Sequence, residues 1–462
     1  MRKKLVLGLA ALALLVGIAA WAALRVTRPG PEWTVASSAA LAALERGLEA
    51  ERKYYHAEAH RRFAEAIELD PGCAACRLGL LRTSRLDYDG AKAAAEELAA
   101  LDRERLNDRE RFLVDRTVAR LTGDDARAAE LARAYVRRHP ADPYALEAQA
   151  DELWEERRFD EVERIYLRIL EIDPNYVTAQ NRLGYLAMAQ GDFAAAEDRF
   201  RTYRYVAPDQ ANPHDSLGEL YVLTGRWDEA RAELEEALSI RPDFCASYEN
   251  LIHVAVLTRE PQQALPVLRR AAEPGRCDEH TLERQRCRIE LWTRLLAGHH
   301  ADLATGFEES CSARLRVSPW IPHLAALLEG DLDAARDIEA WVIEQQRKRE
   351  GDAARDATTP HLAAVRLVAE REPEAAAERF AAADALLDFW TGNGVFKLYN
   401  RLQWVNALEH AGDGAGAAKL LGEVAAVNPA LAQSYREGEV LRPAPLPGSP
   451  AGRRRGAART LR

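Results

Sequence analysis

The segment NPHDSLGELYVLTGRWDEARAELEEALSIRP, residues 212–242, has two short stretches of helix-periodic apolar residues, joined by a Gly-Arg-Trp-Asp turn and closed by a proline. Much of it reappears 34 residues earlier, where Leu183-Gly184 takes the place of Leu217-Gly218. The closing proline recurs at the same spacing, as Pro140, Pro174, Pro208 and Pro242. A period of this length indicates one helix-turn-helix unit that is stacked many times along the chain.

The composition of the chain favours helices throughout. Its 462 residues are rich in Ala, Leu, Arg and Glu, which are good helix formers. Residues that favour strands never gather into alternating runs. We therefore expect an all-α protein of stacked antiparallel helix pairs, because one pair cannot bury its own apolar face and becomes stable only against its neighbours.

The small and apolar positions within each unit resemble those of the tetratricopeptide repeat family. The eighth position holds Ala150, Gly184 or Gly218, and the thirty-second holds the proline. The twentieth, twenty-fourth and twenty-seventh positions of three units are Val162, Tyr166 and Ile169, then Ala196, Phe200 and Tyr203, then Ala230, Leu234 and Ala237. The resemblance is clearest over residues 107–276. It implies a right-handed α-solenoid whose open concave groove, lined by the first helix of each unit, binds partner proteins and often peptides.

The N-terminal residues are of a different kind. Three basic residues at positions 2–4 precede twenty uncharged, almost wholly apolar residues at 5–24. A helix of this length spans the hydrocarbon core of a bilayer, so residues 1–25 are predicted to be a transmembrane signal anchor. The basic cluster predicts a cytoplasmic N-terminus, with the repeats in a bacterial periplasm or at the cell exterior. The alternative is a signal peptide cleaved after the Ala-Trp-Ala of residues 20–22, which would make the protein secreted.

Four further parts follow along the chain. Residues 26–36 are a predicted Pro/Gly linker, 37–276 a repeat array of about seven units, 277–437 degenerate helix pairs, and 438–462 a disordered Pro/Arg-rich tail. The tail has no apolar face with which to fold. Its arginines are either free or in contact with anionic lipid head groups. Within the degenerate part, one helix is expected at 300–313.

The charge of the chain argues against binding to nucleic acid. The net charge is −10, and the part between residues 33 and 436 holds 52 basic and 70 acidic residues. A nucleic-acid interface needs a basic face. An acidic body of this kind suits a soluble domain or a basic partner.

The expected groove is acidic, with aromatic residues between the acids. Its residues are Tyr144, Glu147, Asp151, Trp154, Asn181, Tyr185, Asn212, Asp215, Glu219, Glu249 and His253. Aromatic residues often anchor interfaces, and the asparagines can bond the backbone of an extended peptide. In the family's carboxylate clamp, cations at such positions hold an acidic peptide terminus, whereas acids stand there in this chain. We therefore expect a basic or neutral partner segment, the alternative being that the acids only form a solvated helix face.

An even number of cysteines permits disulfides if the repeats lie outside the cytoplasm. The six are Cys73, Cys76, Cys245, Cys277, Cys287 and Cys311. Cys73 and Cys76 have the spacing of a redox dithiol at a helix start, but without the usual βαβ context. A structural disulfide and two ordinary buried residues are the other interpretations of this pair. Cys277 can pair with Cys287 or with Cys311, near a turn that enters a helix.

The sequence contains no nucleophile elbow, phosphate loop, dinucleotide fingerprint, zinc-protease motif or calcium loop. We expect no enzyme activity, cofactor, metal or small-molecule substrate. The predicted function is a non-catalytic, membrane-tethered scaffold that mediates protein–protein interactions in the cell envelope. The alternatives are a thiol-redox or cofactor-maturation factor that uses Cys73 and Cys76, and an accessory subunit of an enzyme made by another chain.

Overall fold

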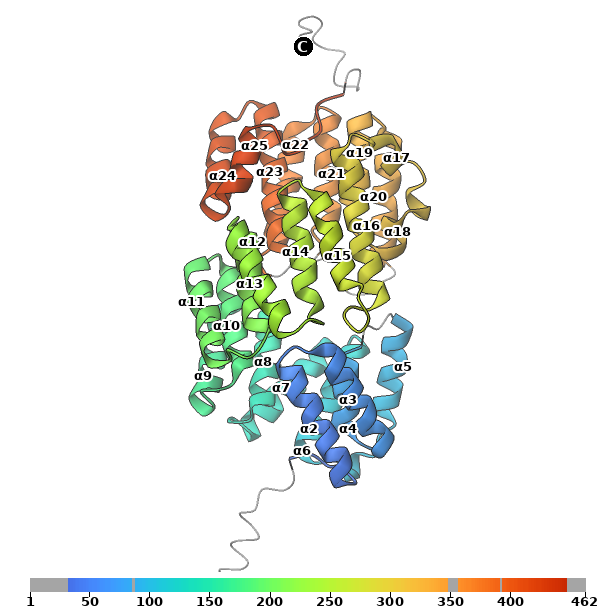
Figure 1. Ribbon diagram of the computed structural model, residues 1–462, viewed down its shortest axis with the longest axis vertical. Coiled ribbons are helices and arrows are strands. Elements are labelled where there is room, and N and C mark those ends of the chain that lie inside the picture. Colours follow the sequence, from blue (N-terminus) through green and yellow to red (C-terminus); the bar gives the residue numbers. More distant parts are fainter. Residues whose placement is uncertain (1–31, 85–87, 348–355, 391–392, 447–462) are drawn as a thin grey trace, which may run out of the picture. The chain divides into compact units, whose positions relative to one another are not determined.

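The computed structural model describes residues 32–84, 88–347, 356–390 and 393–446. Within these ranges the regular structure consists of α-helices and short 3-10 helices, and no strand is found. The prediction of an all-α protein is therefore confirmed for this part of the chain. The chain divides into two compact units, Met1–Tyr135 and Val136–Arg462 (Figure 1).

The first unit is built on a phenylalanine held between two glycines. Its helices are α2 (Ser38–Arg52), α3 (His56–Leu69), α4 (Ala74–Arg82), α5 (Tyr88–Ala99), α6 (Asp108–Leu121) and most of α7 (Asp125–Arg138). Phe63 of α3 is fully buried. A Cβ atom added to Gly47 or to Gly79 would lie 2.6 Å or 2.5 Å from its ring. Only glycine lets α2 and α4 come this close to α3.

The last residues of the predicted linker, 32–36, are packed onto the first unit. Trp33 is buried. The backbone N–H of Thr34 donates to Glu110 Oε1 at 2.8 Å, and that of Ala36 donates to Asp70 Oδ2 at 2.7 Å. Residues 32–36, predicted as linker, therefore belong to the first unit, because they find carboxylate acceptors on α6 and at the end of α3.

The second unit begins with four helix pairs in the phase of the repeat. They are α8 (Pro143–Glu155) with α9 (Phe159–Ile172), α10 (Val177–Gln190) with α11 (Phe193–Val206), α12 (Asn212–Leu223) with α13 (Trp227–Ile240), and α14 (Cys245–Leu257) with α15 (Ala264–Ala271). A Cβ atom on Gly184 would lie 2.3 Å from the ring of Phe200, and one on Gly218 would lie 2.6 Å from Leu234. The eighth position is small because the second helix of the same pair fills that space.

The rest of the second unit is also helical. Its helices are α16 (Glu279–Leu296), α17 (His300–Ala304), α18 (Cys311–Leu315), α19 (Trp320–Glu329), α20 (Leu332–Arg347), α21 (Thr358–Ala369), α22 (Pro373–Leu386), α23 (Asn393–Ala411), α24 (Gly414–Val427) and α25 (Pro429–Arg436). The single helix predicted at 300–313 is wrong. Gly306 adopts a left-handed backbone conformation with φ of 70°, which interrupts the helix and leaves two short ones.

One hydrophobic core joins the two ends of the second unit. Met188 of α10, Leu220 of α12 and Val254 of α14 belong to the same buried cluster as Leu402 of α23 and Leu420 of α24. Figure 1 shows α24 beyond one end of α12, and Asn428, which follows α24, donates to the backbone oxygen of Leu223 at that end. The C-terminal ends of these first helices are thus covered by the chain itself. The groove expected from the family resemblance is not open along its whole length.

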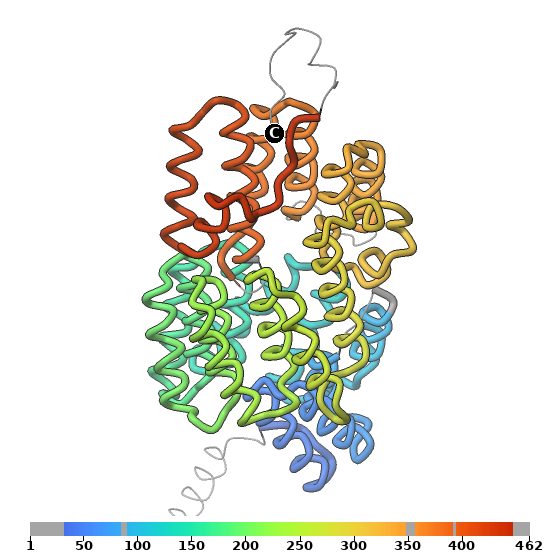
Figure 2. Tube along the Cα trace, turned by 45° about the horizontal axis from the view of Figure 1, so that its top comes forward, coloured from blue at the N-terminus to red at the C-terminus, as the bar shows by residue number. Residues whose placement is uncertain are grey.

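The tail predicted to be disordered from residue 438 begins with an extended, packed segment. Residues 439–446, termed the strap, follow α25 and run past α23 (Figure 2). Val440 and Pro443 of the strap are buried. The prediction of disorder is therefore wrong for the strap, and residues 447–462 lie outside the described part of the chain.

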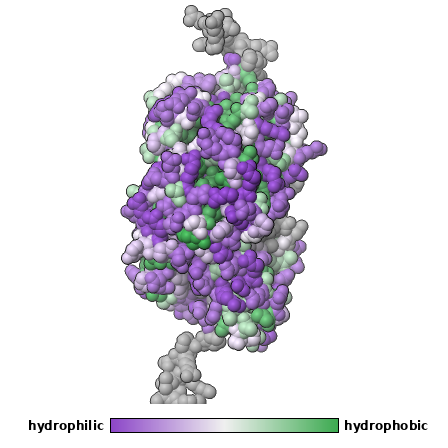
Figure 3. Space-filling model, in the orientation of Figure 1, coloured by the Kyte–Doolittle hydropathy of each residue, from purple (hydrophilic) through white to green (hydrophobic). Residues whose placement is uncertain are grey.

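The predicted membrane segment, residues 1–25, also lies outside the described residues. Among the helices of the described ranges, none has both the length and the apolar character needed to cross a bilayer. Hydrophilic residues cover most of the face seen in Figure 3, and hydrophobic residues gather there in small patches.

Candidate functional site

Three of the predicted groove residues are buried between neighbouring helices. They are Asn181, Asn212 and Asp215. Asn181 Oδ1 accepts a hydrogen bond from Ser216 Oγ at 3.0 Å, and Asp215 Oδ1 accepts one from Ser247 Oγ at 2.7 Å. Asn212 donates to a tyrosine hydroxyl of α11. Their assignment to an open groove is therefore wrong, because the neighbouring helices approach closely enough to cover these positions.

Other predicted groove residues also link one first helix to the next. The Tyr185 hydroxyl on α10 donates to Glu219 Oε2 on α12 at 2.8 Å. Burial, together with the nearby carboxylates, raises the pKa of Tyr185 well above its ordinary value. Gln285 Nε2 on α16 donates to Glu249 Oε2 on α14 at 2.8 Å. The inner face of the array is thus a series of hydrogen bonds between repeats.

The environment of Asp215 is that of a structural link. Burial raises its pKa to about 6, although the hydrogen bonds from Ser247 and Asn250 act in the opposite direction. The carboxyl group lies between α12 and α14, where both neutral donors come from α14. A basic peptide cannot reach it without separating the two helices.

The predicted residues nearest the start of the second unit face outward to differing degrees. Asp151 on α8 is exposed, and Tyr144 and Glu147 on the same helix are half-buried. Trp154 at the end of α8 packs against Trp390, with ring centroids 4.7 Å apart. His253 on α14 is half-buried. The eleven predicted residues therefore form no continuous surface. The acid among them that is exposed is Asp151 on α8.

Sequence reasoning missed a second surface, which binds the strap. The Gln403 side-chain amide on α23 donates to the backbone oxygen of Leu441 at 2.8 Å, and the Asn406 amide donates to that of Pro443 at 3.2 Å. At the end of the strap, the N–H of Leu446 donates to the backbone oxygen of Ala369 at 2.9 Å. The signal in the sequence is a set of amide side chains three residues apart on α23, at Asn400, Gln403 and Asn406.

A small pocket lies next to this surface. It is lined by Trp320, His323, Leu324, His361, Leu362, Val365, Tyr399 and Gln403. His323 Nδ1 and Gln403 Oε1 are buried there without a hydrogen-bond partner. The other nitrogen of each side chain has a partner. His323 Nε2 lies 3.0 Å from Glu339 Oε1, and Gln403 Nε2 donates to the strap.

The histidines of this pocket are hydrogen-bond acceptors. Burial lowers the pKa of both His323 and His361, to about 4 for His361, so both rings are neutral at pH 7. Asn400 donates to a backbone oxygen of α22, which turns its Oδ1 toward His361 Nδ1 at 2.9 Å. His361 Nδ1 therefore carries the proton and Nε2 keeps its lone pair. Such a pocket suits one small hydrogen-bond donor, such as a buried water molecule.

The cysteines form three disulfides, and two of them differ from the predicted pairing. Cys245 is bonded to Cys277 and Cys287 to Cys311, with Cα–Cα distances of 5.6 and 5.8 Å. The expected pairing of Cys277 with Cys287 or Cys311 is therefore wrong. Cys277 lies 32 residues after Cys245, which is close to one repeat, so the two sulfurs come from equivalent places in consecutive units.

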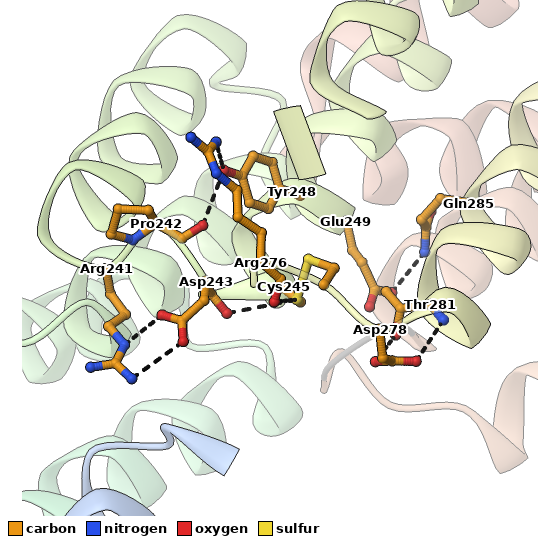
Figure 4. The surroundings of a disulfide bond; sticks show 11 residues. Arg241, Pro242, Asp243, Cys245, Tyr248, Glu249, Arg276, Asp278, Thr281 and Gln285 are labelled. Atoms are coloured by element: carbon orange, nitrogen blue, oxygen red, sulfur yellow. Dashed lines mark hydrogen bonds and ion pairs between the residues drawn. A yellow bond between two sulfur atoms is a disulfide. The ribbon is translucent and has the colours of Figure 1, made fainter. Parts of the chain in front are cut away.

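The Cys245–Cys277 disulfide, shown in Figure 4, ties the first residue of α14 to the segment that precedes α16. Arg276 Nη1 donates to the Tyr248 hydroxyl at 2.6 Å, and that hydroxyl donates to the backbone oxygen of Pro242 at 3.1 Å (Figure 4). The disulfide and these hydrogen bonds fix one repeat against the next just where the strict repeat phase ends.

The third disulfide joins Cys73 and Cys76 in the first turn of α4. Both residues are completely buried. Thiol–disulfide exchange needs an accessible sulfur, so this burial disfavours the redox interpretation of the pair. Among the described residues, no group of three or more His, Cys, Asp or Glu side chains is placed to hold a metal ion.

Comparison with known proteins identifies the repeat. Two models of the tetratricopeptide repeat family match the chain, over residues 153–217 and 213–244. This part of the second unit is thus similar to tetratricopeptide repeats, as the spacing predicts. It contains α9 and the two pairs α10/α11 and α12/α13.

Solved structures with a similar arrangement are distant in sequence. The chain is similar to the crystal structure of the APC/C hetero-tetramer Cut9–Hcn1, with a TM-score of 0.45, 15% identity, and coverage of 87% of this chain and 76% of that chain. It is also similar to a tetratricopeptide repeat protein from Parabacteroides merdae, with a TM-score of 0.35, 14% identity, and coverage of 63% and 99%. Since both scores are below 0.5, the fold assignment rests on the helix pairs and the family match.

Proposed function

We propose that the protein is a non-catalytic scaffold that binds other proteins through the helical repeats of its second unit. Support comes from the tetratricopeptide repeat match at residues 153–244. The buried charged and polar residues of α10, α12 and α14 are used to hold repeats together. Protein-binding surfaces on such an array are therefore sought where side chains remain accessible.

The observation that carries the proposal is how α23 holds the strap. Side-chain amides of Gln403 and Asn406 bond the backbone oxygens of an extended segment. This is the mode of peptide binding that we expected from asparagines on a first helix. The array thus has side chains arranged to bind an extended chain, which is the chemistry that a scaffold requires.

We further propose that the scaffold is tethered to a membrane and lies outside the cytoplasm. The uncharged run at residues 5–24, preceded by three basic residues, supports an anchor. Three disulfides support an oxidising compartment, because disulfides rarely persist in the cytosol. An extracytoplasmic assembly partner with a basic or neutral segment follows from the acid exposed on α8.

The test is capture of partners by crosslinking in the native membrane, followed by charge reversal on α8. We expect the double variant Glu147→Lys/Asp151→Lys to reduce recovery of the main partner at least fivefold. The matched control is Asp160→Lys/Glu163→Lys on the second helix α9, which should leave recovery unchanged. Equal recovery for both variants would show that the acids of α8 are only a solvated face, and capture of no protein at all would refute the scaffold proposal.

A further inference from the structure

We propose that the strap is a displaceable ligand held in cis, and that the surface under it binds an extended, proline-containing segment of a partner protein. This inference rests on the proposed scaffold function and names the partner of one site. The strap surface consists of Gln403, Asn406 and Glu409 on α23 together with Ala369 and Arg371 at the end of α21.

The strap is held through its backbone as well as through apolar side chains. Val440 is buried in the cluster that α12 and α23 share, and Leu441 and Leu446 pack against the cluster that includes α19 and α21. Gln403 and Asn406 donate to the carbonyl oxygens of residues 441 and 443. Arg371 Nε donates to the backbone oxygen of Leu446 at 2.9 Å, and Ala369 accepts from the N–H of the same residue. Hydrogen bonds to backbone atoms do not depend on the side chains of the bound segment. A segment of another protein in the same extended conformation can therefore form the same hydrogen bonds.

The spacing of the donors matches an extended ligand. Residues three apart on a helix are separated by roughly 4.5 Å along its axis, and carbonyl groups two residues apart in a polyproline helix are separated by roughly 6 Å. The flexible amide side chains cover the difference. Gln403 and Asn406 are thus about one helical turn apart and bond alternate residues of the strap. The surface therefore favours a ligand whose backbone is extended.

The prolines of the strap fit this mode of binding. Pro443 is buried, and Pro445 is partly buried. A proline has no N–H group, and its ring fixes φ near the value of the polyproline helix. A buried proline therefore leaves only its carbonyl to be satisfied, which Asn406 does. A partner segment with proline at this position would likewise need a hydrogen bond only to its carbonyl oxygen.

One strap side chain indicates the preferred charge of the partner. The Arg442 guanidinium lies 4.3 Å from the centre of the Tyr435 ring and pairs with Glu409 at 3.3 Å. A cation in this place is stabilised by a cation–π interaction with the ring and by an ion pair with the carboxylate. The surface therefore fits a segment of the type Leu-Arg-Pro-x-Pro, in agreement with a basic or neutral partner.

The strap competes with any such partner from within the chain. It follows directly on α25, so its local concentration at the surface is on the order of millimolar or higher. The intact protein should then bind a free peptide weakly, and removal of the strap should expose the surface.

The test uses a fluorescein-labelled peptide with the strap sequence, EVLRPAPL, residues 439–446. Three forms are compared by fluorescence anisotropy: the full chain, a chain ending at residue 446, and a chain ending at residue 438. The last two differ only by the strap. We expect the chain ending at 438 to bind the peptide at least tenfold more tightly than the other two. The double variant Gln403→Leu/Asn406→Leu in that chain should lose at least tenfold of the affinity, whereas Gln190→Leu, at an exposed end of α10, should lose none.

Hydrogen exchange on the full chain keeps the inference testable if the shortened chain does not fold. We expect amides of residues 440–446 to exchange at least tenfold faster than those of α23, and an excess of unlabelled peptide to accelerate them further. A folded chain ending at 438 that does not bind the peptide, or strap amides that exchange as slowly as α23, would overturn the inference. If the strap inference fails in either of these ways but partners are still captured by crosslinking, the scaffold proposal stands. If the chain ending at 438 binds the peptide but no partner is captured, the scaffold proposal is refuted and the strap inference stands.

Discussion

Asp215 is a carboxyl group that the fold places between two helices. Its hydrogen-bond donors, Ser247 and Asn250, are neutral. Taking a charge out of water is unfavourable unless its partners compensate for the lost hydration. The raised pKa of about 6 is the sign that compensation is incomplete. At pH 7 this residue therefore costs the folded state free energy.

Replacement of Asp215 by asparagine should make the protein more stable at neutral pH. The pKa rises from an ordinary value of 3.8 to about 6 on folding, so between these values the folded state binds the proton more readily than the unfolded state. The contribution of Asp215 to stability is greatest at low pH and is lost as the pH rises through about 6. We expect Asp215→Asn to raise the free energy of unfolding at pH 7.5 by at most about 3 kcal/mol.

Urea denaturation at pH 7.5 and at pH 4.0 measures this effect. The difference in stability between the two proteins should be small at pH 4.0, where the carboxyl group is largely protonated in the folded state. Asp228→Asn, at a side chain that is 99% exposed, is the control and should change little at either pH. A variant that is less stable than the parent at pH 7.5 would mean that the ionised carboxylate is favourable at this site.

At the scale of the helix pair, the contact at the eighth position determines how closely the two helices pack. Gly184 on α10 faces Phe200 on α11, and Gly218 on α12 faces Leu234 on α13. Both facing residues are fully buried, so they have no room to move aside. The repeat therefore requires a small residue on the first helix and a large one on the second.

The same substitution at two glycines should have opposite effects. In Gly184→Ala the new methyl group would lie 2.3 Å from the Phe200 ring, so we expect a loss of about 1–3 kcal/mol in stability from overpacking. Gly422 lies within α24, is exposed, and has no atom within 4 Å of an added Cβ. Gly422→Ala should therefore gain about 0.5–1 kcal/mol through helix propensity. Thermal unfolding of both variants tests this, and a neutral Gly184→Ala would contradict the tight packing.

The period of the sequence predicts a small residue at the eighth position, where the two helices of a pair come close, because this feature is local. It does not identify Phe200 of the same pair as the residue that Gly184 faces. It does not give the distance between first helices of consecutive units, so the sequence pattern places Asn181 and Asp215 in an open groove although they are buried. The pairing of Cys245 with Cys277 follows the repeat and was available from the sequence, since the two are almost one period apart.

At the scale of the whole second unit, contacts between segments far apart in sequence become decisive. A simple repeat array has contacts only between neighbouring units. In this chain Asn428 at the start of α25 donates to the backbone oxygen of Leu223, 205 residues away, at 3.0 Å. The hydrophobic cluster around it includes residues from α10, α12, α14, α23 and α24.

These long-range contacts could not be predicted from the sequence. The strap looks like a disordered tail because it is rich in proline and has no apolar periodicity. Its order comes from partners 37 and 38 residues away on α23, for which a local pattern contains no information. The same holds for the covering of α12 by α24.

Because one hydrophobic cluster joins α10, α12 and α14 to α23 and α24, we expect these two groups of helices to unfold together. Leu402 of α23 is fully buried in the shared cluster. Leu402→Ala should cost about 2–5 kcal/mol, as large-to-small substitutions in a core do. Because the cluster includes Leu217, Leu220 and Leu223, we expect the amides of α12 to exchange faster in this variant by the same free energy as those of α23. Leu265→Ala, at a side chain that is 45% exposed, should leave both helices unchanged. Mass-spectrometric hydrogen exchange decides between the alternatives, since an array with only neighbour contacts would show faster exchange in α23 and its neighbours while α12 kept the protection of the parent protein.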